Sequence, residues 1–228
     1  KISIPRPGHA DLVGVSKYNF NDIRNSIERS SARETAARVA AGTIARKLLE
    51  EFGITIGSYV ESIGGIYPED NFSEKLFNNS IPLNFSAQSI SDKSDKSSVR
   101  VLESEQEEKI IRKIKSAKKN GDTLGGTFLT VATGVPVGLG SFMNYDTKLD
   151  ADIAHSIMSI NAVKAVEIGE GFLLAEKVGS ESHDEIVMKK DFIGRKTNRA
   201  GGIEGGVSTG LPIIVRAAMK PIATLMSP

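Results

Sequence analysis

The sequence lacks cysteine altogether, and its charges almost cancel. The absence of cysteine excludes disulfides, thiolate metal sites and thiol catalysis. With 29 Lys and Arg against 28 Asp and Glu, the net charge of +1 gives no electrostatic reason to expect a nucleic-acid partner. No apolar run approaches the roughly 20 residues of a membrane-spanning helix, and no signal peptide is visible. We therefore expect a cytoplasmic globular protein with no membrane or nucleic-acid partner.

Residues 29–35, with the sequence Arg-Ser-Ser-Ala-Arg-Glu-Thr, predict the start of a helix that holds an anion. Ser31 and Glu34 have the spacing of a capping box. The residues that follow carry apolar side chains on one side, which predicts an amphipathic helix that ends at Gly53.

Two arginines give this helix start a possible function. Free N–H groups and the positive end of the helix dipole favour a phosphate there. Arg29 and Arg33 flank the same end, where the dipole alone would disfavour cations, so a negative ligand between them would explain the arrangement. The alternative is an ordinary capped helix with solvated arginines.

The N-terminal segment contains a histidine in a motif rich in turn residues. Arg6-Pro-Gly-His-Ala-Asp11 predicts a rigid, irregular loop, because prolines fix φ and glycine frees it. His9 follows an arginine closely and could donate a proton near neutral pH. It could equally be an exposed loop histidine.

Helix and strand signals alternate along the rest of the chain. Ser104 and Glu107 form a second capping box, which predicts a helix that ends near Asn120, and Asp150 or Asp152 predicts the start of another. Runs rich in β-branched residues between turn signals predict strands. The predicted strands cover residues 54–63, 127–133, 163–168, 172–178 and 211–219.

One stretch lacks any periodicity. Residues 71–98 are rich in Ser, Asp and Lys, so we expect a mobile polar loop there. The stretch is short enough to be an insertion, and we therefore expect one domain spanning residues 1–228.

Glycine clusters mark places where the backbone bends sharply. The densest runs from 198 to 210 and contains apolar residues, which favours a packed loop over a flexible one. No glycine segment has the spacing of a dinucleotide fingerprint or a P-loop. Lys220, just before a proline, is a weak candidate for a phosphate contact.

Taken together, these motifs resemble one family. The sequence is similar to chorismate synthases in motifs that occur in the family's order and span nearly all 228 residues, most weakly over 71–96. The motifs are Arg6-Pro-Gly-His-Ala-Asp11, Arg29-Ser-Ser-Ala-Arg-Glu-Thr35, Gly121-Asp-Thr-Leu-Gly-Gly126, Gly134-Val-Pro-Val-Gly-Leu-Gly140, Asp150-Ala-Asp-Ile-Ala-His155, Met158-Ser-Ile-Asn-Ala-Val-Lys164, Asn198-Arg-Ala-Gly-Gly-Ile-Glu-Gly-Gly206 and Lys220-Pro-Ile222.

The resemblance implies a fold and an activity. The fold is α+β, a β-α-β sandwich with helices layered between antiparallel sheets, and the expected assembly is a homotetramer. The activity is a lyase reaction in aromatic amino acid biosynthesis, the anti 1,4-elimination of phosphate from 5-enolpyruvylshikimate 3-phosphate to give chorismate. It requires reduced FMN without net redox change.

The resemblance also assigns site residues. His9 matches a functional histidine that acts as an acid toward the reduced flavin, and Arg6 and Arg33 match arginines that hold the anionic substrate. No metal ligands are implied. The expected FMN contacts are Arg29, Ser30, Ser31, Asn161, Ala162, Gly205, Lys220, Pro221, Ile222, Ala223 and Thr224, with only main-chain contacts inferred from the last positions of the 220–224 segment.

The sequence also departs from the family pattern. Chains of this family begin well before the Arg6 motif, with a Gly-Glu-Ser-His-Gly stretch that carries a second histidine, and they continue past Lys220 to an Arg-Asp pair near the flavin. Neither stretch is present, so the sequence resembles an internal part of the family's chain. We expect no turnover if these residues are the whole molecule. The alternative function is a non-catalytic module that binds FMN or phosphate, or an assembly fragment.

Overall fold

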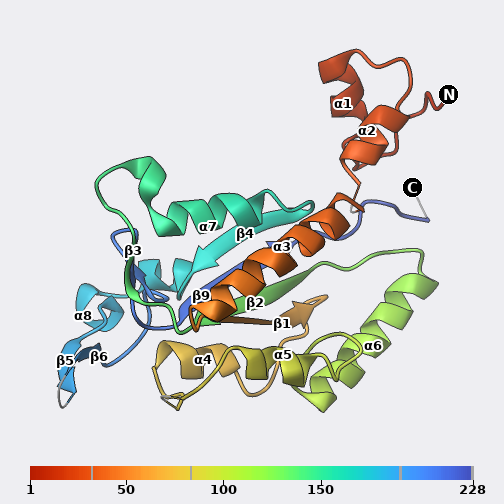
Figure 1. Ribbon diagram of the computed structural model, residues 1–228. Helices are drawn as coiled ribbons and strands as arrows, with labels where there is room; N and C mark the ends of the chain where they lie inside the picture. The colour runs from red at the N-terminus through yellow and green to blue at the C-terminus, as the bar shows by residue number, and fades with distance from the viewer. Residues whose placement is uncertain (32, 83, 190–191, 227–228) are drawn as a thin grey trace.

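A four-stranded antiparallel sheet forms the centre of the fold. The computed structural model describes residues 1–31, 33–82, 84–189 and 192–226 (Figure 1). The strand order is β1-β2-β9-β4, with every neighbouring pair antiparallel. The predicted strands at these four positions are confirmed, as is a mixed α+β fold with antiparallel sheets. The strands are β1 (Thr55–Ile63), β2 (Gly126–Thr133), β9 (Ile213–Met219) and β4 (Val163–Ile168).

The sheet carries a hydrophobic core on each face, because side chains alternate along its strands. In β9, Ile214 belongs to one core and Val215 to the other. The Ile214 core is covered by α4 (Phe72–Phe77) and α5 (Gln88–Ser94). Side chains of α7 (Leu149–Met158) pack on the Val215 core, together with Leu49. Figure 1 shows α7 on one side of the sheet and α4 and α5 on the other.

The predicted polar loop at 71–98 is wrong. This stretch contains α4 and α5, and its Leu76, Phe77 and Ile90 are buried in the core. Helix α5 has few apolar residues, and buried serines hold it to β1: Ser91 Oγ accepts the amide hydrogen of Ser58 at 3.2 Å, and Ser94 Oγ donates to the carbonyl of Ser58 at 3.0 Å.

The basic helix predicted after Ser104 is confirmed, but its capping box is not formed. Helix α6 (Ser104–Lys119) has Glu103 at its N-cap, and no side-chain hydrogen bond caps it. The Glu107 carboxylate instead accepts hydrogen bonds from the amide and hydroxyl of Ser98, at 2.8 and 2.6 Å. The helix ends at Asn120 as predicted, and Gly121 follows with a positive φ of 68°.

The glycine-rich segment folds into a small packed sheet. Its strand order is β3-β8-β7, and Ile203 in β7 is buried. A separate hairpin pairs β5 with β6. The predicted strand at 172–178 is wrong, because residues 171–176 form a 3-10 helix (η2) in which Leu173 donates to the carbonyl of Glu170. The elements in this part of the chain are β3 (Val137–Gly140), η1 (Tyr145–Thr147), η2 (Gly171–Glu176), α8 (Gly179–Ser182), β5 (Ile186–Lys189), β6 (Phe192–Arg195), β7 (Ile203–Glu204) and β8 (Val207–Thr209).

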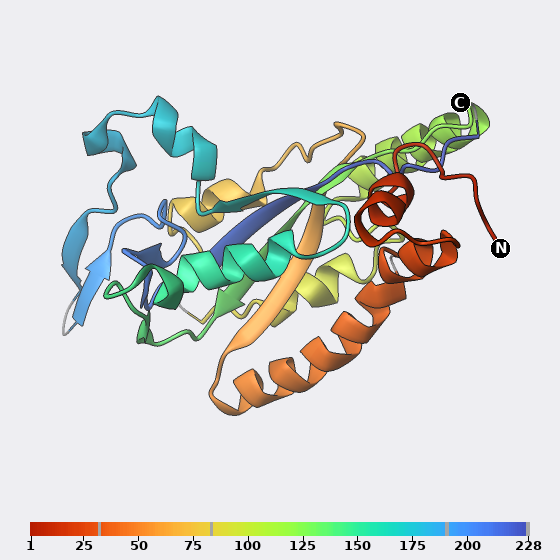
Figure 2. The same cartoon turned by 90° about the horizontal axis from the view of Figure 1, so that it is seen from above.

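Two short helices at the N-terminus, α1 (Asp11–Tyr18) and α2 (Arg24–Arg29), stand apart from the sheet. Figures 1 and 2 show them at one end of the molecule, beside the C-terminal segment. Helix α3 (Arg33–Glu51) leads from them along the sheet. It is helical as predicted, yet its apolar residues Val39, Ile44 and Leu48 are exposed, so in this chain its apolar side is largely uncovered.

Candidate functional site

Three segments that are distant in sequence meet beside α1 and α2. The His9 Nε2 atom shares a hydrogen bond with Thr224 Oγ1 at 2.8 Å, and Lys220 Nζ donates to the carbonyl of Gly8 at 3.3 Å. The backbone N–H of Lys220 donates to the carbonyl of Ala162 at 2.9 Å. The structure therefore brings the predicted residues at 9, 162, 220 and 224 into one place.

Asn161 connects the same place to the segment before α3. Its amide nitrogen donates to the carbonyls of Ser31 and Ser30, at 2.9 and 3.3 Å. Ala162, which follows, has a positive φ of 72°, a conformation that alanine adopts at an energetic cost. The Lys220 N–H to Ala162 carbonyl bond supports that backbone geometry.

The predicted helix start at 29–35 has a different local structure. Arg29 is the last residue of α2, and α3 begins at Arg33, so Arg29 lies at a helix C-terminus, where a cation is favourable. The Ser31 hydroxyl accepts the amide hydrogen of Arg33 at 3.1 Å, whereas Glu34 pairs with Arg38 along α3. The capping box and the argument from repulsion at the dipole are therefore wrong in detail. Both arginines remain exposed next to the site.

Arg6 is already paired within its own loop. Its Nε and Nη2 atoms donate to the two carboxylate oxygens of Asp11, at 2.8 and 3.0 Å. The Asp11 side chain is fully buried, while that of Arg6 is 42% exposed. The hydrogen bonds from Arg6 lower the pKa of the Asp11 carboxyl below its ordinary value. The sequence motif contains Asp11, but a hydrophilic loop gives no signal that its carboxylate is buried.

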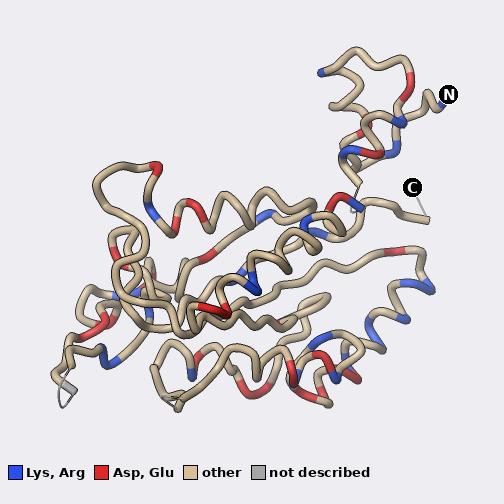
Figure 3. Tube along the Cα trace, in the orientation of Figure 1, with Lys and Arg blue, Asp and Glu red and all other residues tan. Residues whose placement is uncertain are grey.

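A cavity of about 550 Å³ opens between the N-terminal helices and Asn161. Three of the predicted FMN contacts, Arg29, Ser30 and Asn161, line it. The cavity also has an aromatic wall that sequence reasoning missed, since Tyr18 and Phe20 stack with ring centroids 5.4 Å apart. Figure 3 shows blue segments in α2 and α3, in keeping with the exposed cations there. The lining residues are Ala10, Val13, Gly14, Lys17, Tyr18, Phe20, Asn25, Ser26, Arg29, Ser30 and Asn161.

The remaining predicted flavin contacts divide into two groups. Pro221, Ile222 and Ala223 lie in the segment that carries Lys220 and Thr224, and a Cβ built on Gly8 would lie 3.1 Å from that of Ala223. Gly205 lies in the turn between β7 and β8, beside the start of α7, where Gly206 accepts a hydrogen bond from Leu149. The ten residues of α7, about 15 Å long, separate that end from Asn161. Within one chain, the structure does not bring Gly205 to the other residues.

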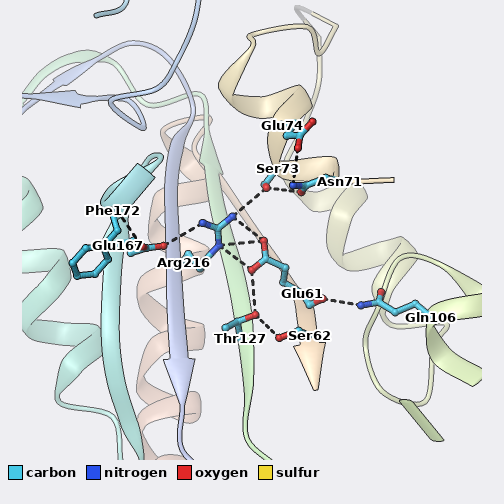
Figure 4. A network of polar contacts seen from close by, with 10 residues as sticks. All are labelled: Glu61, Ser62, Asn71, Ser73, Glu74, Gln106, Thr127, Glu167, Phe172 and Arg216. Carbon is cyan, nitrogen blue, oxygen red and sulfur yellow. Dashed lines mark hydrogen bonds and ion pairs between the residues drawn. The ribbon is translucent and has the colours of Figure 1, made fainter. Parts of the chain in front are cut away.

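A second polar cluster lies on the α4 side of the sheet (Figure 4). Arg216 in β9 donates to both carboxylate oxygens of Glu61 at 2.8–3.1 Å, and to Glu167 at 3.1 Å. A cavity of about 460 Å³ lies beside these residues. The hydroxyl of Thr127 also donates to Glu61, and the backbone amide of Phe172 donates to Glu167. All four carboxylate oxygens of Glu61 and Glu167 therefore accept a hydrogen bond. We interpret this cluster as a structural connection among strands.

The described part of the chain shows neither a membrane-spanning helix nor a cluster of metal ligands. Among those residues, no helix is long and apolar enough to cross a membrane. No group of three or more His, Asp or Glu side chains in the same residues could hold a metal ion.

Comparison with known proteins decides the family. The family model described as "Chorismate synthase" matches residues 1–228. The chain belongs to the chorismate synthase family. Two curated relatives named "Chorismate synthase" show how close the match is: the protein from Chlorobaculum parvum is 53% identical over 231 residues, and the one from Listeria welshimeri is 51% identical over 229 residues.

The match covers this chain fully but its family relatives only in part. All of this chain aligns, against 55% of the Chlorobaculum parvum protein and 56% of the Listeria welshimeri protein. A solved structure titled "Crystal Structure of Chorismate Synthase" is 46% identical, with a TM-score of 0.87 over 94% of this chain and 64% of that one. The fold predicted from the resemblance is therefore confirmed.

Proposed function

We propose that the protein containing this chain catalyses the elimination of phosphate from 5-enolpyruvylshikimate 3-phosphate to give chorismate. One observation supports this beyond membership of the family. Residues from the family's motifs at positions 9, 161, 162, 220 and 224 lie in contact with one another or with Ser31, although they are distant in sequence. Convergence of separate motifs at one place is the expected result if they serve one site.

The residues at this place fit reduced FMN as the cofactor. Arg29 and Lys220 supply cations for its phosphate, and the hydroxyl of Ser31 supplies a further hydrogen-bond donor, whereas that of Ser30 donates to the carbonyl of Ser26 at 2.6 Å. The cavity beside Arg29 has the stacked pair Tyr18 and Phe20 on its wall, which suits a planar ring. When bound, reduced FMN supplies electron density for the elimination without net redox change.

The substrate is highly anionic, since it carries a phosphate and two carboxylates. We assign Arg6 and Arg33 to hold these groups. Asp11 accepts one hydrogen bond from Nε and one from Nη2 of Arg6, so both N–H groups of Nη1 and the second N–H of Nη2 are available to the substrate. His9 holds its Nε2 atom toward Thr224, where it can pass a proton within the site.

The activity is tested by an anaerobic assay with reduced FMN and 5-enolpyruvylshikimate 3-phosphate. Phosphate release and chorismate absorbance are followed together, both for these 228 residues and for the chain with the flanking sequence of its reading frame. We expect the longer protein to be active and the 228 residues to be inactive. No activity from the longer protein would refute the proposed function.

A non-catalytic module that binds FMN or phosphate is the second candidate. It needs only cofactor contacts, and the cavity lined by Arg29, Ser30 and Asn161 supplies them. FMN titration separates the two, because a binding module should hold FMN without converting the substrate.

We also propose a homotetramer, for two reasons. The exposed apolar residues Val39, Ile44 and Leu48 on α3 provide a surface that another part of the assembly could bury. Gly205 is remote from the other predicted FMN contacts of its own chain, so a neighbouring copy would have to bring it to the flavin. Sedimentation of the protein with its flanking sequence tests this assembly.

A further inference from the structure

Asp11 is the best-buried carboxylate of the N-terminal segment. Its side chain is fully buried, and it accepts three hydrogen bonds from Arg6, from Nε, Nη2 and the backbone amide. Among the described residues, Arg6 is the only donor to this carboxylate. Since a buried charge depends on its partner, Asp11 restricts both the backbone and the guanidinium of Arg6.

These bonds close a short loop whose middle contacts the C-terminal segment. Between Arg6 and Asp11, the backbone turns at Gly8, where φ is +71°, and the amide of His9 donates to the carbonyl of Arg6. Gly8 accepts a hydrogen bond from Lys220, and His9 contacts Thr224. A change in the loop would therefore move His9 as well as Arg6.

We propose that Asp11 is a positioning residue for the elimination, acting through Arg6 and His9. This inference rests on the proposed function. It assigns Asp11 two effects: it points one free edge of the Arg6 guanidinium toward the anionic substrate, and it fixes the loop so that His9 faces Thr224. Asp11 itself does not touch substrate or flavin. Asp11 also partly neutralises the charge of Arg6, and this effect alone would lower the affinity of Arg6 for an anion.

The variant Asp11→Asn tests the proposal, with Asp22→Asn as its matched control. Asp22 accepts hydrogen bonds from the backbone amide and Nη2 of Arg24 and from the amide of Ile2, so it holds a comparable arginine in the same segment. Neither Arg24 nor Ile2 is a predicted site residue. Both variants are made in the protein with its flanking sequence and measured anaerobically for kcat, substrate KM and FMN Kd.

We expect Asp11→Asn to lower kcat and to raise substrate KM, each about tenfold, because small displacements of positioned groups are costly in rate. The FMN Kd should stay within about twofold, and Asp22→Asn should leave all three constants within about twofold. If Asp11 had a purely structural role, its replacement would weaken the binding of FMN and the binding of substrate together. A double variant with Arg6→Gln should be no worse than the more impaired single variant, since the two residues act as a unit.

Four results would overturn the proposal. The first is that Asp11→Asn has the same kinetics as the control, and the second is that it lowers the substrate KM, which would make Asp11 only a counter-charge. The third is that FMN affinity falls in parallel with substrate affinity. The fourth is that the effects of Asp11→Asn and Arg6→Gln on kcat and KM are additive. If Asp11→Asn does not fold, Asp11→Glu takes its place and should raise substrate KM at least about threefold with FMN Kd unchanged. An inactive unsubstituted protein is a separate outcome, which refutes the proposed function and this role with it.

Discussion

Replacing Arg216 by methionine should destabilise the fold strongly. The guanidinium connects β9 to Glu61 in β1, Glu167 in β4 and Ser73 in α4. The Glu61 side chain is 4% exposed, so without Arg216 its carboxylate stays buried and, among the residues that the structure describes, keeps only the hydroxyl of Thr127 as a donor. Removing one partner of a buried pair costs about 3–5 kcal/mol.

We expect the lower end of that range, because Arg216 and Glu167 are each 18% exposed and water can reach the gap. A loss of about 3 kcal/mol corresponds to a fall of about 10 °C in Tm for a domain of this size. Urea unfolding followed by circular dichroism gives the change in the free energy of unfolding from the shift in midpoint at constant slope.

Arg195→Met is the matched control for this prediction. Arg195 has the same 18% exposure but pairs with Glu204, which is 44% exposed, so its loss should cost less than about 1 kcal/mol. Equal losses in the two variants, or a loss below about 1 kcal/mol for Arg216→Met, would refute the argument from burial of Glu61.

Three other predictions concern the site and the core. Arg33→Ala should weaken substrate binding with little change in FMN affinity, whereas Arg29→Ala should mainly weaken FMN; equal losses of both ligands, measured by flavin fluorescence and by KM, would contradict this division. Because the folded-state pKa of Asp11 is lowered, its stabilisation is present at neutral pH and is lost as pH falls through the acid range. The stability difference between wild type and Asp11→Asn in urea should therefore shrink on acidification. Leu76→Ala should cost about 3 kcal/mol if α4 is part of the core, and a loss near zero would restore the loop interpretation.

Much of the fold was predictable because its central strands follow simple patterns. β-branched and apolar runs located β1, β2, β4 and β9. Helix α5 was missed because its contact with β1 depends on serine hydroxyls, which are polar in a sequence pattern, and α4 was missed because its six residues are too few to show a helical period. Gly57 shows the packing that results: a Cβ there would lie 1.8 Å from the carbonyl oxygen of Ala87, so only glycine allows β1 to approach so closely.

The candidate site was predictable by motif and not by geometry. The order of the motifs identified His9, Asn161 and Lys220, but no local pattern indicates that Asn161 donates to Ser31 or that His9 contacts Thr224. Local reasoning placed a helix start at 29–35 but did not predict α2, the separate helix that ends at Arg29. Such long-range contacts depend on the whole fold, which sequence spacing does not contain.

The contacts of the 220–224 segment also have a consequence for how the protein is made. His9 and Thr224 are 215 positions apart, and Lys220 and Gly8 are 212 apart. A ribosome must therefore synthesise the chain past residue 224 before both pairs can meet. Contacts of such sequence separation close the largest loops and form late in folding. Nascent chains stalled before residue 220 should contain the paired strands β1 and β2 but be unable to hold His9 in place, so ligand binding would report that the 220–224 segment has been made.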